Sequence, residues 1–451
     1  MSASLRAAER EGRGAADSSR RSTPGATASR EQGTGRARGS FLWPSIITGL
    51  VLLSWCVARA PLRDMDTWRS AQHAQLVRPL AYVVLAPVCD VLDALTLLSV
   101  RQTIALVASL VVVYATWRIV RRGRGGSLLR RVGRETALAV VALAVLLSVY
   151  AVGALVPRPM AALRLDDPDL IAVDFHSHTN ASHDGRAWFT SARNRAWHSA
   201  AGFDAAYITD HKSFAGAEAA ARANPPRAGD GTVLLSGLEF VHDHNHVNAL
   251  GVTPRDFTSP AAIAQGDGPA PVGPTQSQPV LIQTIPDQLD RTDAPSPSGR
   301  DGVLAIELSD GAPRGIDQVQ RDRTRILRMA DSLNLAVVAG SDNHGWGRTA
   351  VAWSVLRIPG WRSLTPAALG AAIEQTVRTE RRAASRVIAR RSPDAGRSPL
   401  ALAATLPAVA GTMLVTLSPA ERLSWLLWTW GITALVLVGA RRRHRVRDER
   451  P

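Results

Sequence analysis

Long apolar segments at both ends of the 451-residue chain restrict its possible folds more than any other feature. Four precede a polar middle region, at about 41–58, 79–100, 102–119 and 136–156, and two follow it, at about 399–417 and 422–440. A run of about 20 apolar residues crosses a bilayer as an α-helix, because a helix satisfies its backbone hydrogen bonds internally. The sequence therefore predicts an integral membrane protein of the bacterial plasma-membrane type, with six spans around one polar domain.

Composition divides the chain into six regions. Residues 1–40 contain few large apolar side chains and are predicted to form a disordered basic tail. The other regions are a transmembrane region (41–156), a polar domain (160–361), a helix and linker (362–397), a C-terminal transmembrane hairpin (398–440) and a basic tail (441–451). The segment at 79–100 carries Asp90 and Asp93, and we expect it to lie partly at the membrane interface.

The formal net charge of +15 comes almost entirely from arginine, since Lys212 is the only lysine. Many arginines lie beside apolar segments, which favours membrane anchoring and argues against a nucleic-acid partner. No protein partner is identifiable. Arginines at 386–397 and 441–450 outnumber those at 118–134, so the positive-inside rule predicts that the polar domain is cytoplasmic.

The polar domain alternates strand-like and helix-like patterns. Strands are predicted at Leu170–Phe175, Ala205–Thr209, Thr232–Ser236, Val247–Val252, Val280–Thr284, Val303–Leu308 and Leu335–Ala339, and helices at about 190–201, 213–222, 315–333 and 365–380. This alternation indicates β/α units around a parallel sheet or barrel. The stretch 258–300 is rich in Pro, Gly, Ser, Gln and Asp and is predicted to be a long mobile insertion.

A His-x-His motif, His176 and His178, ends the first predicted strand of the domain. Residues two apart in a strand point to the same face, so the two imidazoles can bind one metal ion. The motif alone is weak evidence, because histidine pairs are common on protein surfaces.

Further ligand-type residues follow the other predicted strands. They are Asp210 and His211 in ITDH, Glu239 in SGLEF, His242, His244 and His246 before the fourth strand, and Asp342 and His344 in GSDNH. Strand ends on one rim of a β/α barrel converge in space. Five separate strands are unlikely to end this way by chance, so the sequence predicts one metal-binding cluster.

These motifs, with SHDG after DFHSHT, resemble in the same order those of the PHP (polymerase and histidinol phosphatase) family over residues 165–360. The resemblance implies an α/β fold, a distorted (β/α)7 TIM-like barrel flanked by transmembrane α-helices, and hydrolysis of phosphate esters. It implies metal ligands His176, His178, Asp184, His211, Glu239, His246, Asp342 and His344. Glu239 corresponds to the carboxylate that bridges two metal ions.

The chain departs from the family at the fifth strand, where the ligand histidine is missing. The segment reads Leu-Ile-Gln-Thr-Ile-Pro, and Ile285 occupies the ligand position. Gln283, His183, His242 or His244 could compensate, although a solvated loop position is the simpler interpretation of His183. His198 is expected to have a surface or packing role.

A mixed histidine and carboxylate set suits two divalent ions such as Zn, Mn or Fe better than Mg or Ca. Glu239, Asp342, His211 and Asp210 are the predicted catalytic residues, with Asp210 orienting a ligand histidine. Lys212 and Arg186 either hold the substrate phosphate or are ordinary surface charges. The expected substrate is a phosphorylated small molecule, and membrane tethering makes a lipid- or envelope-linked one attractive.

Three alternatives to the phosphoesterase stay open. The missing histidine on the fifth strand motivates a catalytically degenerate sensor or scaffold, which metal content and phosphoesterase activity would distinguish from an enzyme. A metal-dependent nuclease is a second alternative, although no nucleic-acid module is visible in the sequence. A hydrolase of amide bonds is the third, and the TDH and closing DxH motifs argue against it.

Overall fold

The computed structural model describes residues 28–120, 128–242, 245–266, 268, 279–284, 303–393 and 398–448. The first part of the predicted basic tail, His244 and Ile285 lie outside these residues. The chain divides into two compact units, Leu50–Trp428 and a smaller unit formed by the segments on either side. In the smaller unit, helix α1 (Ala28–Cys56) contacts helix α13 (Pro419–Asp448), since the Trp430 indole donates to Thr48 Oγ1 at 3.1 Å.

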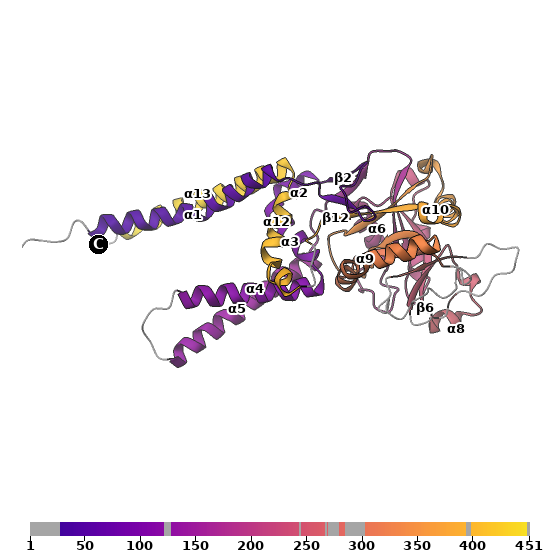
Figure 1. Cartoon of the computed structure of the whole chain (residues 1–451), viewed down its shortest axis with the longest axis horizontal. Coiled ribbons are helices and arrows are strands. Elements are labelled where there is room, and N and C mark those ends of the chain that lie inside the picture. Colours follow the sequence, from indigo (N-terminus) through magenta and orange to yellow (C-terminus); the bar gives the residue numbers. More distant parts are fainter. Residues whose placement is uncertain are drawn as a thin grey trace, which may run out of the picture. The chain divides into compact units, whose positions relative to one another are not determined.

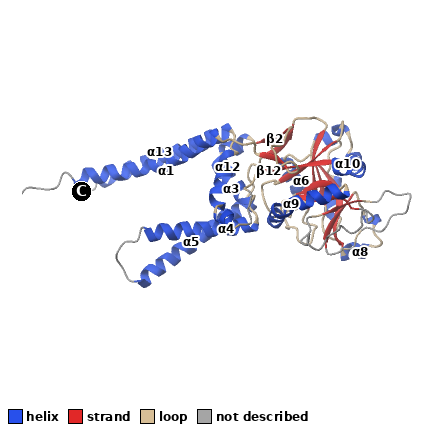
Figure 2. Ribbon diagram, viewed as in Figure 1, coloured by secondary structure: helices blue, strands red, loops and turns tan. Residues whose placement is uncertain are grey.

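Ten strands of the larger unit form one curled mixed sheet, drawn in red in Figure 2. They are β1 (Leu62–Asp64), β4 (Leu170–Ser177), β5 (Ala205–Ile208), β6 (Val233–His242), β7 (Asn245–Leu250), β8 (Val280–Gln283), β9 (Val303–Asp310), β10 (Ala336–Gly340), β11 (Ala352–Arg357) and β12 (Ser385–Arg390). The strand order is β1-β12-β11-β4-β5-β6-β7-β8-β9-β10. Strands β2 (Ala74–Val77) and β3 (Ala162–Leu165) form a separate antiparallel pair.

The predicted (β/α)7 TIM-like barrel is wrong, although the α/β class and the seven predicted strands are confirmed. The sheet is a half-barrel in which β7 is antiparallel to both β6 and β8, and β11 is antiparallel to both β4 and β12. The physical reason lies partly in the connection between β6 and β7. Only two residues join these strands, whereas a parallel crossover needs a dozen or more.

The curl of the sheet brings the end of β10 against the end of β4. The Asp342 amide donates to the His176 carbonyl at 2.9 Å, and the His178 amide donates to the Asn343 carbonyl at 3.2 Å. These bonds join segments that are far apart in the chain. They place the closing motif of the domain directly beside its first motif.

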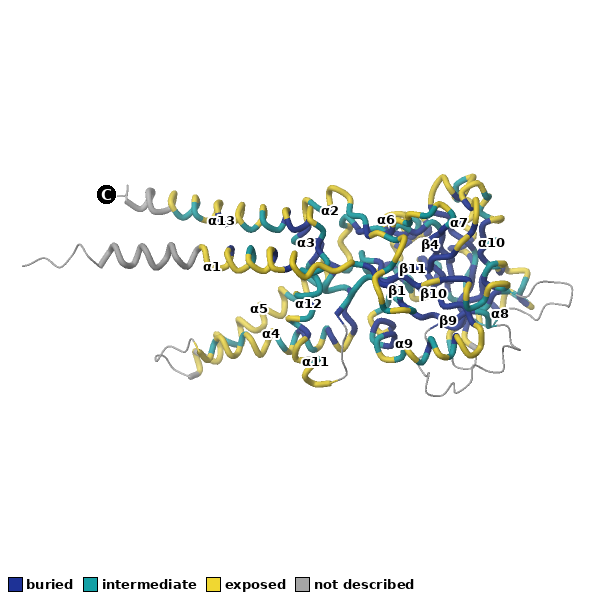
Figure 3. Tube along the Cα trace, turned by 45° about the horizontal axis from the view of Figure 1, so that its top comes forward, coloured by how far each residue is buried: buried dark blue, intermediate teal, exposed yellow. Residues whose placement is uncertain are grey.

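Helices pack against the sheet, and Figure 3 shows buried residues along the strands of the larger unit. The helices of this region are α6 (Ser191–Ala201), α7 (Ala215–Arg222), α8 (Pro260–Gln265), α9 (Pro313–Leu333) and α10 (Pro366–Glu380). Helix α9 begins at a proline and is ended by Asn334 in the left-handed conformation, as helix termini prefer. Its residues Ile316, Val319 and Ile326 are buried, at the spacing of one helical face.

Three helices among the described residues are long and apolar enough to cross a membrane: Val100–Val120, Val132–Leu155 and Pro419–Arg442. They lie in α4 (Val100–Val120), α5 (Leu128–Leu155) and α13. Figure 1 shows α4 and α5 directed away from the sheet.

The described residues thus contain three such helices, whereas the sequence has six apolar segments. The segment predicted at 79–100 is divided into α2 (Leu80–Val84) and α3 (Ala86–Thr96), with a proline in the first turn of α3. The segment predicted at 399–417 is divided into α11 (Pro399–Ala403) and α12 (Thr405–Val415). The apolar part of α1, Phe41–Cys56, is also shorter than a full span.

Asp90 and Asp93 are both buried, and the position of their segment at the membrane interface stays a prediction. The Tyr82 hydroxyl oxygen lies 3.0 Å from an oxygen of each carboxylate, so its single proton is shared between two acceptors. Asp93 also forms ion pairs with Arg158 at 2.8 Å and with Arg390 of β12 at 2.7 Å. The short helices are thus joined to the sheet by a buried charged network.

Candidate metal centre

The His-x-His motif lies at the buried end of strand β4. All eight of its residues are buried, so the strand is fixed from both faces. His176 and His178 are buried too, and their Nε2 atoms lie 3.0 Å apart. Two buried imidazole nitrogens that face each other at this distance need either a proton or a cation between them.

Two carboxylates lie beside these nitrogens. Glu239 Oε2 lies 2.9 Å from His176 Nε2 and 3.2 Å from His178 Nε2. Asp342 Oδ1 lies 3.4 Å and 3.3 Å from the same two nitrogens. Ligands bound tetrahedrally at about 2.1 Å would be about 3.4 Å from one another. The ligand atoms of His176, His178 and Glu239 therefore have the spacing expected around one divalent ion, and Asp342 contacts both histidines beside this set.

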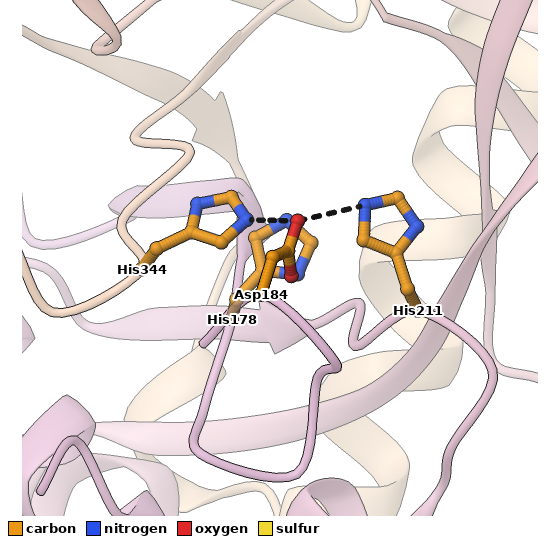
Figure 4. Close-up of side chains that lie close together, drawn as sticks. All are labelled: His178, Asp184, His211 and His344. Atoms are coloured by element: carbon orange, nitrogen blue, oxygen red, sulfur yellow. Dashed lines mark ion pairs between the residues drawn. The ribbon is translucent and has the colours of Figure 1, made fainter. Parts of the chain in front are cut away.

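A second group combines Asp184 with three histidines, as Figure 4 shows. Asp184 Oδ2 lies 3.1 Å from His344 Nε2 and 3.7 Å from His211 Nε2. The His178 ring stacks on the His344 ring with 4.0 Å between centroids, and His178 Nδ1 is buried without a hydrogen-bond partner. One ligand atom from each of the four residues lies within 4.8 Å of all the others.

Glu239 also belongs to a third group, which contains His211 and His246. Its Oε2 faces His211 Nε2 at 3.2 Å, whereas its Oε1 contacts His246 Nδ1 at 2.6 Å. The two oxygens of one carboxylate thus point to different histidines. This arrangement suits a carboxylate that bridges two cations.

The charged groups of the cluster, together with burial, shift the pKa values of its members. Burial alone would raise the pKa of Glu239, but His176 and His178 hold it well below its usual value. Burial would lower the pKa of His178, yet hydrogen bonds to Asp342 and Glu239 raise it to about 9. Burial lowers the pKa of His211 to about 4, against the attraction of Glu239. At neutral pH the metal-free cluster therefore holds protons on some histidines while His211 is neutral.

Two carboxylates missed by the sequence analysis support the first ligand pair. Glu307 on β9 is buried and contacts His176 Nδ1 through Oε1 at 2.8 Å. Asp174 accepts the His176 amide at 3.1 Å and the Ser341 amide at 2.9 Å. Its other oxygen contacts His198 at 2.7 Å, which confirms a packing role for that histidine. A charged residue inside an apolar strand, as in Ile-Glu-Leu, was the available signal for Glu307.

The other predicted site residues have different surroundings. Asp210 accepts two hydrogen bonds from Thr179, at 2.5 Å from its amide and 2.7 Å from its hydroxyl, and so holds the loop after His178. The Arg186 guanidinium lies 3.2 Å from the centroid of the Trp346 ring. Lys212 is exposed, and His183 is 61% exposed.

Gly340 is required by close packing at the centre. A Cβ atom at this position would lie 2.5 Å from Glu307 Oε1 and 2.6 Å from the His176 Cβ. Any other residue would displace one of these groups. The glycine before the closing motif therefore allows β10 to approach β4.

Comparisons with known proteins give weak likenesses only. No family model and no curated protein matches the chain. Among solved structures, PsfC from Pseudomonas syringae is 14% identical with a TM-score of 0.34, and the match covers 54% of this chain and 98% of PsfC. The structure of "a putative metal-dependent phosphoesterase" from Bifidobacterium adolescentis is 18% identical with a TM-score of 0.25, covering 38% and 87%. With TM-scores this low, the functional argument rests on the side chains of this chain alone.

Proposed function

We propose that this chain is a membrane-anchored, metal-dependent phosphoesterase of the PHP type. One observation supports this most: Nε2 of His176, Nε2 of His178 and Oε2 of Glu239 lie 2.9 to 3.2 Å from one another. Asp342 Oδ1 adds a second carboxylate oxygen at 3.3 to 3.4 Å from the two nitrogens. Both nitrogen and oxygen donors contribute, which suits Zn, Mn or Fe.

Asp184, His211 and His344, with His178, would hold a second ion, and Glu239 offers an oxygen to each neighbouring group of histidines. When bound, such ions polarise phosphoryl oxygens and activate water for attack on phosphorus. Glu239 contributes negative charge at neutral pH, because its pKa is held low by the surrounding histidines. His211 stays neutral at that pH and can accept a proton or serve as a ligand.

The reaction is hydrolysis of a phosphate ester. The P–O bond to the leaving alcohol breaks, a P–O bond to the water oxygen forms, and the alcohol oxygen receives a proton. Arg186 is the best-situated cation for the phosphate, since its amide donates to the His344 carbonyl at 3.0 Å. Three apolar helices support membrane anchoring, and a cytoplasmic position of the domain remains the proposal from arginine counts.

A catalytically degenerate sensor is the second candidate. Strand β8 ends in the buried Gln283 rather than in a histidine. The group of His211, Glu239 and His246 therefore offers three ligands, and one is half exposed.

The experiment is hydrolysis of p-nitrophenyl phosphate and bis-p-nitrophenyl phosphate by the full chain in detergent, loaded with Mn, Zn or Fe. We expect turnover by wild type and by His73→Ala, an exposed histidine outside the cluster, and none by His176→Ala/His178→Ala. Metal binding without turnover of either ester would favour the sensor.

A further inference from the structure

We propose that the substrate is a phosphate ester of a membrane lipid, and that Trp188 and Trp346 seat the rim of the metal centre at the bilayer surface. This inference rests on the proposed phosphoesterase activity and names its substrate class.

The first step is the path of the loop that follows β10. This loop carries the ligand candidates Asp342 and His344, and it continues directly to the last turn of α5. The Gly347 amide donates to the Ala154 carbonyl at 3.0 Å, and the Arg348 guanidinium donates to the Leu155 carbonyl at 3.4 Å. Gly347 is the third residue after His344, which is at most about 11 Å of extended chain. The metal centre thus lies close to the end of an apolar span.

The second step is that this loop is held firmly against the helices. Thr349 Oγ1 donates to Asp93 Oδ1 at 2.9 Å and accepts from Arg158 at 2.9 Å. Arg158 also donates to the Arg348 carbonyl at 3.1 Å and pairs with Asp93 at 2.8 Å. Because Arg158 and Asp93 are largely buried, these bonds fix the distance between the ligand loop and α5.

The third step is the character of the exposed surface there. Val152 and Leu155 of α5 are exposed apolar residues, and Trp346, which precedes the Gly347 that bonds to Ala154, is 43% exposed. Trp188 is 44% exposed, and the Arg186 guanidinium lies 6.0 Å from its ring centroid and 3.2 Å from that of Trp346. Tryptophans are enriched where a membrane meets water, because the ring is apolar and its N–H is polar.

Charge complements this surface. Arg186 lies between the tryptophans, and Arg348 lies near Arg158 and Arg193, which lower its pKa together with burial. Within the described part of the chain, Arg158 is the one of these four side chains that forms an ion pair with a carboxylate, that of Asp93. A basic rim beside an apolar span attracts anionic headgroups. The rim therefore suits a phosphate that is presented at the bilayer surface by an apolar tail.

The test compares lipids that share a headgroup and differ in their tails, with the full chain in nanodiscs. The pairs are dioleoyl and dibutyryl phosphatidic acid, as monoesters, and dioleoyl and dibutyryl phosphatidylglycerol, as diesters. We expect kcat/KM for a dioleoyl lipid to exceed that of its dibutyryl partner by at least about tenfold, because apolar tails contribute binding energy. The Trp188→Ala/Trp346→Ala variant should reduce this preference to nearly equal rates, whereas Leu333→Ala, an exposed apolar control on α9, should retain it.

Equal rates for the two tail lengths in wild type would overturn the lipid proposal and leave the phosphoesterase in place. Failure to hydrolyse the lipids and also both p-nitrophenyl esters would instead reject the phosphoesterase itself.

A second measurement does not depend on activity. A nitroxide label at Trp346→Cys, in a Cys56→Ser/Cys89→Ser background, should be more accessible to oxygen than to a soluble nickel chelate in nanodiscs. The same label at Leu333→Cys should show the aqueous pattern. An aqueous pattern at both positions would contradict the seating of the rim at the bilayer.

Discussion

The larger unit contains two polar clusters in which the carboxylates have different partners. At the junction of the short helices and the sheet, Asp93 pairs with Arg158 and Arg390, and Glu421 pairs with Arg78. In the metal centre, Asp184, Glu239 and Asp342 face histidines, and no arginine or lysine pairs with them within the described part of the chain.

The difference shows how the partner decides the role of a buried acid. An arginine supplies a permanent positive charge, so the junction is electrostatically complete and its role is structural. Histidine is neutral or protonated according to pH, so the metal centre has a variable charge and several lone pairs that converge. Such a site is completed by a cation from solution.

The largest expected effect concerns the bridging carboxylate. Glu239→Gln keeps the shape but removes the negative charge, and hydrolysis of p-nitrophenyl esters should fall about a thousandfold, since metal ions supply several kcal/mol to such reactions. Activity assays of metal-loaded protein check this. Activity within a few-fold of wild type would mean that the cluster is not the reaction centre.

At the junction, the expected effect is on stability. Asp93→Asn leaves Arg158 and Arg390 without a carboxylate and should lower the free energy of unfolding by about 3 to 5 kcal/mol. Asp90→Asn is the matched control, because Asp90 contacts the Tyr82 hydroxyl and the Trp425 indole, and its loss should be smaller. Denaturation in detergent measures both free energies of unfolding. Equal losses for the two variants would contradict a special role for the arginine pairs of Asp93.

Metal removal should affect only one cluster. A chelator should lower the thermal stability of wild type, by about 2.7 kcal/mol when the metal had been present at 100 times its dissociation constant. Glu239→Gln should show little response to the chelator, whereas Asp93→Asn should respond as strongly as wild type. Thermal melts with and without chelator provide the comparison.

Replacing Glu307, the carboxylate that contacts His176, should have a moderate effect on metal affinity. Glu307→Gln weakens the contact with His176 Nδ1 and should reduce metal affinity about 10- to 100-fold. Titration with a competing metal indicator measures the change. An unchanged affinity would show that Glu307 only fills space beneath the histidine.

A further effect, spread over several pH units, comes from the protonation of His178. The pKa of His178 is raised to about 9 in the metal-free fold, so this ring contributes stability below pH 6.5 that is lost as pH rises through 9. A metal ion must displace that proton, and its apparent affinity should rise by up to about tenfold per pH unit in the same interval. Metal affinities measured from pH 6 to 9 test whether binding strengthens as pH rises.

The sequence predicted the seven strands well, because each is a short apolar run. It also pointed to side chains that the fold gathers into one cluster, since each motif follows such a run, whereas their role as metal ligands stays a prediction. It could not predict the sheet. The two-residue connection before Asn245 forces an antiparallel pair, but the strand extending to His242 was not apparent from the composition.

Contacts between segments that are distant in the chain could not be predicted from the sequence either. Glu307 and Asp174 acquire their roles only when β9 and β4 curl towards each other, and Asp93 acquires its role only beside Arg390, which is 297 residues away in the chain. Tertiary packing determines such pairs, and no local pattern reports them. A single charged residue within an otherwise apolar segment was the signal common to Glu307, Asp90 and Asp93.

The most direct test of the metal centre is elemental analysis with X-ray absorption on the purified full chain, for wild type and His176→Ala/His178→Ala. We expect wild type to bind about two ions of Zn, Mn or Fe with nitrogen and oxygen neighbours at about 2.0 to 2.2 Å, and the variant to lose at least one of them. Equal metal content in both proteins, or none in either after reconstitution, would contradict a metal centre built on β4.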